Sequence, residues 1–155
     1  MTTGPQNAVP FGKYLLLKRL AVGGMAELYL AKEVELDRLV VLKRILPYLA
    51  QETAFVRMFL DEARIASQLH HPHIIQMHEL GQLEGSIFIA MEFVEGVDLR
   101  KTLQQEQKRQ VAVPVDIAAW LCARLCEVLH YAHNKIGTDG RPLGIIHRDV
   151  SPQNL

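Results

Sequence analysis

L-V-V-L-K-R-I, residues 39–45, is the stretch that decides the fold, together with the helical run that follows it at residues 53–70. Its β-branched and aliphatic residues predict a strand. Side chains alternate along a strand, so Lys43 shares one face with Val41 and Ile45. The pattern therefore places a cation on an otherwise apolar strand face.

The helical run at residues 53–70 places an acid in a comparable position. At about 100° per residue, Glu62 falls in the middle of the apolar stripe of this helix. A buried carboxylate without a cation is costly, so we expect Glu62 to pair with Lys43. The alternative is that Lys43 extends to solvent while Glu62 lies at the edge of the stripe. The stripe consists of Phe55, Phe59, Ala66 and Leu69.

The composition narrows the possible classes of function. Lys plus Arg and Asp plus Glu each number 17 in 155 residues, which argues against a duplex nucleic-acid binder because such a protein needs a basic face. No apolar run reaches the roughly 18 residues of a membrane span, so we expect no membrane contact within the chain. Cys122 and Cys126 do not form a C-x-x-C motif, and we interpret them as buried thiols of a cytoplasmic protein.

Turn signals divide the rest of the chain into short elements. Residues 1–10 are expected to form a flexible tail. The glycine pair Gly23-Gly24 predicts a hairpin loop, and residues 135–143 predict a turn or hairpin insertion. A short helix and then a long one, at residues 114–133, are predicted in the second half. Five strands are predicted, at residues 11–20, 28–31, 39–45, 74–80 and 86–93.

The chain ends H-R-D-V-S-P-Q-N-L, residues 147–155. His-Arg-Asp followed by Asn154, five residues after the aspartate, resembles the catalytic loop of protein kinases. V-V-L-K, residues 40–43, resembles the strand lysine motif of that family, and Glu62 stands 19 positions later, where the family has its helix glutamate. From about Tyr14 onward the chain resembles a eukaryotic-like (Hanks-type) bacterial Ser/Thr protein kinase domain that stops just after the catalytic loop.

This resemblance implies an α+β, protein-kinase-like fold. It comprises a five-stranded antiparallel N-lobe with one helix, at residues 11–93, and a hinge with the helical start of a C-lobe, at residues 94–155. The implied activity is transfer of the γ-phosphate of ATP to a serine or threonine hydroxyl of an unidentified protein substrate, with ATP and Mg²⁺ as cofactors.

The resemblance also assigns catalytic roles. Lys43 would hold the α and β phosphates of ATP, oriented by Glu62. Asp149 would accept or orient the proton of the substrate hydroxyl, and Asn154 would bind one Mg²⁺ through its carbonyl oxygen. The D-F-G aspartate and the activation loop of the family follow the catalytic loop and are not among these 155 residues. We therefore expect a polypeptide of these residues alone to have negligible kinase activity.

A-V-G-G-M-A-E-L, residues 21–28, stands where the family has its glycine-rich phosphate loop. Gly23 matches the central glycine, and Gly24 follows it. Ala21 and Ala26 replace the flanking glycines, and their Cβ atoms would restrict positive φ and close approach of the backbone to a ligand.

The remaining nucleotide contacts are implied by position. Met91 corresponds to the gatekeeper, Glu92 and Val94 would offer backbone hydrogen bonds to adenine, and Asp98 would contact the ribose. The residues that would pack on the adenine ring are Leu20, Leu28 and Val41.

Ser151 departs from the family pattern, because Ser/Thr kinases usually have at this position a lysine that touches the γ-phosphate. Two other classes stay open: a nucleotide-binding or scaffolding pseudokinase, and a small-molecule phosphotransferase of kinase-like fold. The complete H-R-D, together with H-H-P-H-I at residues 70–74 and M-E-F-V-E-G at residues 91–96, favours the protein kinase over the small-molecule enzyme.

Overall fold

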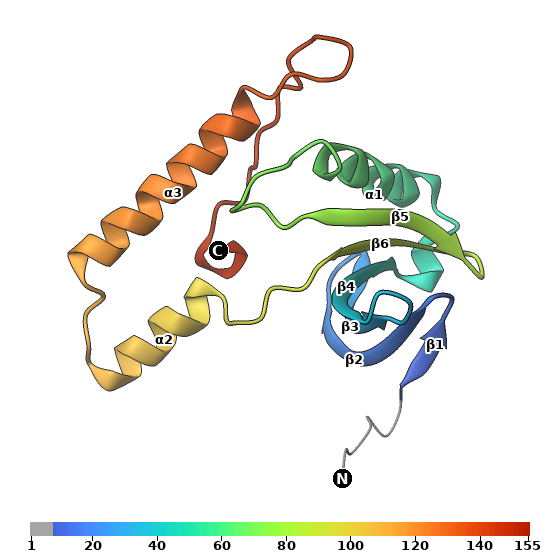
Figure 1. The fold of residues 1–155 in the computed structure, drawn as a ribbon, viewed down its shortest axis with the longest axis horizontal. Helices are drawn as coiled ribbons and strands as arrows, with labels where there is room; N and C mark the ends of the chain where they lie inside the picture. The colour runs from blue at the N-terminus through green and yellow to red at the C-terminus, as the bar shows by residue number, and fades with distance from the viewer. Residues whose placement is uncertain (1–7) are drawn as a thin grey trace. The chain divides into compact units, whose positions relative to one another are not determined.

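The computed structural model describes residues 8–155, which form two units (Figure 1). The first unit contains the described residues through His70 and the segment Ile75–Phe93. The second contains His71–Ile74 and Val94–Leu155. The loop after the first long helix therefore groups with the second unit, although the chain continues from it into two strands of the first.

The first unit is an antiparallel sheet of six strands with one α-helix, α1 (Thr53–Ala66), and a short 3-10 turn, η1 (Pro47–Leu49). The strand order across the sheet is β1-β2-β3-β4-β6-β5. This is one strand more than the sequence predicts. The strands are β1 (Val9–Phe11), β2 (Tyr14–Val22), β3 (Ala26–Glu33), β4 (Arg38–Ile45), β5 (Met77–Leu83) and β6 (Ser86–Glu92).

The additional strand, β1, corrects the expected tail at residues 1–10. Residues 1–7 of that tail lie outside the described residues, but Val9 and Pro10 pair with β2. Proline has no N–H to donate, and it is accepted in an edge strand, which is the position of β1. A three-residue strand that contains proline shows no clear alternation, so the pattern alone does not reveal it.

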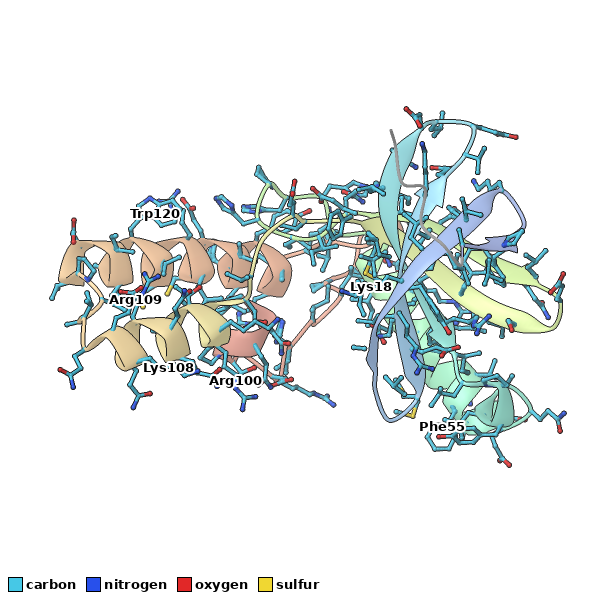
Figure 2. The ribbon with its side chains drawn as sticks, turned by 90° about the horizontal axis from the view of Figure 1, so that it is seen from below. Lys18, Phe55, Arg100, Lys108, Arg109 and Trp120 are labelled. Carbon is cyan, nitrogen blue, oxygen red and sulfur yellow. The ribbon has the colours of Figure 1, made fainter. Side chains whose placement is uncertain are left out.

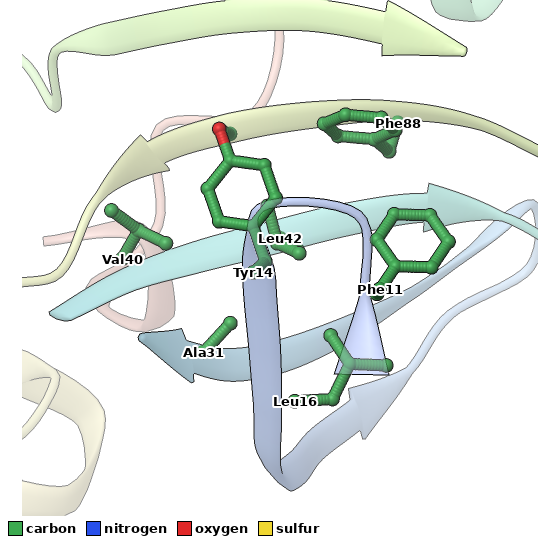
Figure 3. Close-up of a cluster of buried hydrophobic side chains, with 8 residues drawn as sticks. Phe11, Tyr14, Leu16, Ala31, Val40, Leu42 and Phe88 are labelled. Carbon is green, nitrogen blue, oxygen red and sulfur yellow. The ribbon is translucent and has the colours of Figure 1, made fainter. Parts of the chain in front are cut away.

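A cluster of buried side chains packs between the first strands and β6 (Figure 3). Phe88 is at its centre, because its ring meets Phe11 and Tyr14 edge-on, with centroids 5.2 and 5.8 Å away. Gly81 of β5 makes room for this ring, since a Cβ there would lie 2.4 Å from one of its atoms. The cluster consists of Phe11, Tyr14, Leu16, Ala31, Val40, Leu42, Phe88 and Ala90.

A second cluster lies beneath α1 and fixes the helix to the sheet. Phe59 and Ala63 of α1 are fully buried there, against Ile45 of β4 and Ile89 of β6. Phe55 is 37% exposed, so the buried stripe is turned about the helix axis relative to the predicted one. The helix also ends at Ala66, earlier than the predicted residue 70.

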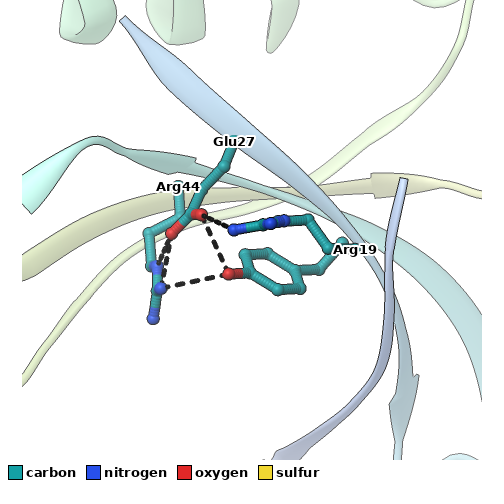
Figure 4. Close-up of polar contacts among 4 residues, drawn as sticks. Arg19, Glu27 and Arg44 are labelled. Atoms are coloured by element: carbon teal, nitrogen blue, oxygen red, sulfur yellow. Dashed lines mark hydrogen bonds and ion pairs between the residues drawn. The ribbon is translucent and has the colours of Figure 1, made fainter. Parts of the chain in front are cut away.

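On the opposite face of β4 from Lys43, Arg44 forms a polar network with β3 (Figure 4). Its Nε and Nη2 atoms donate to Oε1 of Glu27 at 3.0 and 2.5 Å, and the hydroxyl of Tyr29 donates to Oε2 of Glu27 at 2.9 Å. Glu27 is only 5% exposed. Burial alone would raise the pKa of this carboxyl, but the hydrogen bonds from Arg44 and Tyr29 outweigh it and lower the pKa below its usual value.

We expect Glu27→Gln to destabilise the first unit at neutral pH by about 1–3 kcal/mol, because Arg44 loses its buried counter-charge. A carboxyl whose pKa is lowered on folding stabilises above its ordinary pKa of 4.5, and this contribution fades as the pH falls further. The difference between wild type and variant should therefore shrink below that pH. Urea denaturation at pH 7 and pH 3.5 measures this. Asp37→Asn, which removes an exposed ion pair with Lys32, should leave stability nearly unchanged at either pH.

The second unit contains α2 (Leu99–Arg109), α3 (Val115–His133) and a short 3-10 turn, η2 (Pro152–Asn154). Between α3 and η2 the chain forms the expected hairpin, with a β-bridge between Ile136 and Pro142. Cys122 and Cys126 are exposed on α3, so their interpretation as buried thiols is wrong. Among the helices of residues 8–155, none combines the length and hydrophobicity that crossing a membrane requires.

Candidate active site

Lys43 and Glu62 meet as expected, with Nζ of the lysine 2.5 Å from Oε1 of the glutamate. The side chain of Lys43 is 20% exposed and that of Glu62 is 46% exposed. The predicted burial of Glu62 is therefore wrong, because it lies at the edge of the buried stripe rather than in its middle. The ammonium also lies over the ring of Phe59, 5.8 Å from its centroid, so the residue that anchors α1 also supports the lysine.

The strand register gathers the expected adenine-packing residues on the face that carries Lys43. Side chains of directly paired residues point to the same face of a sheet. Lys43 pairs with Leu28 of β3, and Val41 pairs with Met91 of β6. These four positions therefore form an apolar surface with one cation, which suits a flat base joined to phosphates.

The hairpin between β2 and β3, which is expected to cover phosphates, is closed by a tight turn. The N–H of Gly23 donates to the carbonyl of Ala26 at 2.8 Å. Gly24 has no other part of the protein within 4 Å of where a Cβ would lie, so its backbone is open to a ligand. Ala21 and Ala26 are strand residues with negative φ, so the restriction expected from their Cβ atoms does not strain this loop. Leu20 lies at an irregularity in the β2–β3 pairing and is 43% exposed.

Of the residues after Met91 that are expected to contact the nucleotide, Glu92 and Asp98 have structural roles in their own units. The N–H of Glu92 donates to the carbonyl of Gln76 at 2.9 Å, and its side chain accepts from the N–H of Gln76 at 3.2 Å. Val94, in the second unit, is 60% exposed. Asp98 is the N-cap of α2, because its Oδ1 accepts from the N–H of Lys101 at 2.8 Å. The hydrogen bond and ion pair with the Lys101 side chain, followed by this backbone bond, lower the pKa of Asp98.

In the second unit, Asn154 holds Asp149 directly. Its Nδ2 donates to the backbone carbonyl and to Oδ2 of Asp149, both at 2.9 Å. The N–H of Asp149 in turn donates to Nδ1 of His147 at 3.3 Å. Arg148 between them has a φ of +66°, a conformation that is costly for a residue with a side chain. The loop thus presents an exposed carboxylate whose orientation is fixed by its own chain.

The same contacts bear on a metal ion. Because Nδ2 of Asn154 donates to Asp149, the amide oxygen of Asn154 is the atom that can bind a hard cation such as Mg²⁺. Within residues 8–155, the side chains of His, Cys, Asp and Glu form no group of three or more that would hold a metal ion. By its chemistry the Asn154 carbonyl oxygen fits as one ligand of a hard cation.

Two features of the catalytic loop were not expected from the motif. Ser151, where the family usually has lysine, keeps its hydroxyl buried without a hydrogen-bond partner among the described residues. The loop is also tied to α2, because the N–H of Leu99 donates to the carbonyl of Leu155 at 2.8 Å and Nη1 of Arg100 donates to Oε1 of Gln153 at 3.1 Å. Neither contact has a local sequence signal, since the paired residues lie more than 50 positions apart.

Comparison with known proteins decides the family. The family model described as "Protein kinase domain" matches residues 14–155. The chain belongs to the protein kinase family. Tyrosine-protein kinase MasK of Myxococcus xanthus is 44% identical over 94% of this chain, and serine/threonine-protein kinase PknD of Mycobacterium tuberculosis is 36% identical over 97%. The chain covers 23% and 21% of the lengths of these two relatives.

The fold of the kinase chain is shown by similarity to solved structures. A crystal structure of the Mycobacterium tuberculosis PknI kinase domain matches 95% of this chain with a TM-score of 0.69 and 31% sequence identity. The chain covers 55% of that crystallised domain. It is therefore a protein-kinase-like α+β fold that spans the N-terminal part of the domain.

Proposed function

We propose that the chain carries the nucleotide-binding and catalytic-loop parts of an ATP-dependent protein kinase, which transfers the γ-phosphate of ATP to a hydroxyl group of a protein. The observation that carries this proposal is that both side-chain pairs of the family motif are in contact, each within its own unit. Lys43 contacts Glu62 in the first unit, and Asn154 contacts Asp149 in the second. A chance match of motif letters would not require either contact.

The roles follow from the chemistry of each group. Lys43, held by Glu62, would neutralise the α and β phosphates, while Leu28, Val41 and Met91 would cover the adenine. Asp149, oriented by Asn154, would accept a hydrogen bond from the substrate hydroxyl and take its proton during transfer. Bound ATP with Mg²⁺ supplies the phosphoryl group and neutralises charge that develops on it.

The hydroxyl is proposed to be that of serine or threonine, as the names of PknI, PknJ and PknD indicate for those relatives. Tyrosine is the second candidate, because the relative named as a tyrosine kinase has a higher identity than these. Ser151 also leaves the acceptor open, because the lysine that Ser/Thr kinases usually have at this position is absent. Phosphoamino-acid analysis of the product decides between them.

We expect Glu62→Gln to weaken binding of Mg²⁺-ATP to the 155-residue chain by about three- to tenfold. The variant keeps the shape of the side chain but removes the charge that orients Lys43. Titration calorimetry measures the affinity, and circular dichroism verifies that the variant is folded. Asp61→Asn is the matched control, because Asp61 is the adjacent acid and, among the residues that the structure describes, pairs with Arg64 and not with Lys43.

An affinity of Glu62→Gln within twofold of wild type would contradict the proposed role of the pair. Binding of ATP by this chain without transfer to any protein is expected, because the segments that complete a kinase active site are not among its residues. Transfer above the level of a protein-free blank would contradict that expectation.

A further inference from the structure

The first turn of α2 carries a cation that contacts the catalytic loop and forms no ion pair within residues 8–155. Nη1 of Arg100 donates to the neutral amide oxygen of Gln153, at 3.1 Å. Gln153 is the neighbour of Asn154, which contacts the carboxylate of Asp149. All of these residues belong to the second unit, so their arrangement is defined. The guanidinium is therefore exposed and contacts the loop four residues after Asp149, the residue that would receive a substrate hydroxyl.

Cations outnumber acids on and directly before α2. Arg100, Lys101, Lys108 and Arg109 stand on α2, whose only acid is Glu106. Lys101 pairs with Asp98 and Arg109 pairs with Glu106. Among the described residues, no carboxylate forms an ion pair with Arg100. Figure 2 shows Arg100 and Lys108 projecting from the helix into the open.

A neutral partner such as Gln153 orients a guanidinium without neutralising it. Arginine in this state keeps several N–H donors in a planar fork that matches the two oxygens of a carboxylate. Arg100 contacts the catalytic loop, where the protein substrate would place its hydroxyl. A carboxylate that binds Arg100 would therefore belong to the same protein substrate. The occupant is therefore an acidic segment of the protein substrate.

We propose that Arg100, held by Gln153, is a specificity-determining residue that selects protein substrates with an aspartate or glutamate close to the phosphorylated hydroxyl. This inference rests on the proposed function, because it assumes that Asp149 receives a protein hydroxyl. The inference goes beyond the proposed function because it specifies the charge of the substrate segment, about which the catalytic-loop motif says nothing.

The test uses peptides that contain serine, threonine or tyrosine flanked by glutamates, and matched peptides with glutamine in place of every glutamate. Fluorescence anisotropy measures their binding to the 155-residue chain in the presence of Mg²⁺-ATP at low salt. The glutamate peptides should bind roughly three- to tenfold more tightly, the effect of one charge-assisted contact at an exposed site. The preference should shrink at 0.5 M salt, because exposed charges are screened.

Four variants separate charge from structure. Arg100→Gln should abolish the preference, and Arg100→Lys should keep most of it. Gln153→Ala breaks the same hydrogen bond as Arg100→Gln but leaves the cation, so it should weaken the preference without abolishing it. Lys108→Gln removes a cation two turns further along α2 and should leave it unchanged. Glutamate peptides that bind no better than glutamine peptides, or a preference that survives in Arg100→Gln, would overturn the inference. Binding of Mg²⁺-ATP, measured on the same samples, tests the proposed function separately.

Discussion

Asp149→Asn is expected to lower the rate of phosphoryl transfer by about 10²- to 10⁴-fold, measured on the polypeptide as it is encoded, with any segment beyond residue 155 included. Asparagine has nearly the same shape as aspartate, so the loop should keep its conformation. Its amide cannot take up the proton of the attacking hydroxyl, and its NH₂ group repels a donor. The loss should therefore appear in kcat rather than in the affinity for ATP.

The geometry of the catalytic loop sharpens this expectation. Asn154 donates to both the backbone carbonyl and Oδ2 of Asp149, so the carboxylate is held before any substrate binds. An amide at position 149 can turn either its oxygen or its NH₂ group toward Nδ2 of Asn154. Only the oxygen can accept the hydrogen bond from Nδ2. Affinity for Mg²⁺-ATP within twofold of wild type, with activity lost, is the expected result.

Asp139→Asn is the matched control, because Asp139 lies in the exposed hairpin between α3 and the catalytic loop and caps only the N–H of Arg141. It should leave the rate unchanged. An Asp149→Asn enzyme that retains more than about a third of wild-type activity would exclude Asp149 as the group that handles the hydroxyl proton. A wild-type protein that binds ATP but never transfers phosphate would favour the pseudokinase instead.

Patterns that repeat within one element predicted the charged pair well. Alternation along β4 placed Lys43 on an apolar face, and the helical period placed Glu62 in the middle of the apolar stripe of α1, and together these led to the expectation that the two residues pair. The degree of burial was not predictable, because a small rotation of the helix decides whether Phe55 or Ala63 faces the sheet. Packing of the whole buried cluster sets that rotation, and no single residue in the sequence predicts it.

Contacts between segments far apart in the chain could not be predicted from local sequence patterns. The ties from α2 to the catalytic loop join residues that no local pattern connects, such as Arg100 and Gln153. β1 was missed for another reason, since Pro10 argues against a strand unless the strand lies at an edge. The sequence does contain a signal for the N-cap, because Asp98 is an acid directly before a predicted helix. The family resemblance instead assigns Asp98 to a contact with the ribose.

Phe59→Ala is expected to destabilise the first unit by about 3–5 kcal/mol, the largest effect on stability that we predict. The ring is fully buried between α1 and the strands, so its removal leaves a cavity in the cluster that holds the helix. Urea denaturation followed by circular dichroism measures the change. Phe55→Ala removes the same ring from the same helix, but Phe55 is 37% exposed, and the cost should stay below about 1 kcal/mol.

The comparison of these two phenylalanines also tests the link between packing and function. Phe59 lies three residues before Glu62 and beneath the ammonium of Lys43, so a loosened α1 would let the charged pair separate. Phe59→Leu should keep most of the stability, because leucine fills much of the cavity, and should retain more ATP affinity than Phe59→Ala under conditions where both are folded. Equal costs for Phe59→Ala and Phe55→Ala would mean that α1 does not pack as described. In that case the contact between Lys43 and Glu62 would lose its structural support, because the orientation of Glu62 depends on which face of α1 is buried.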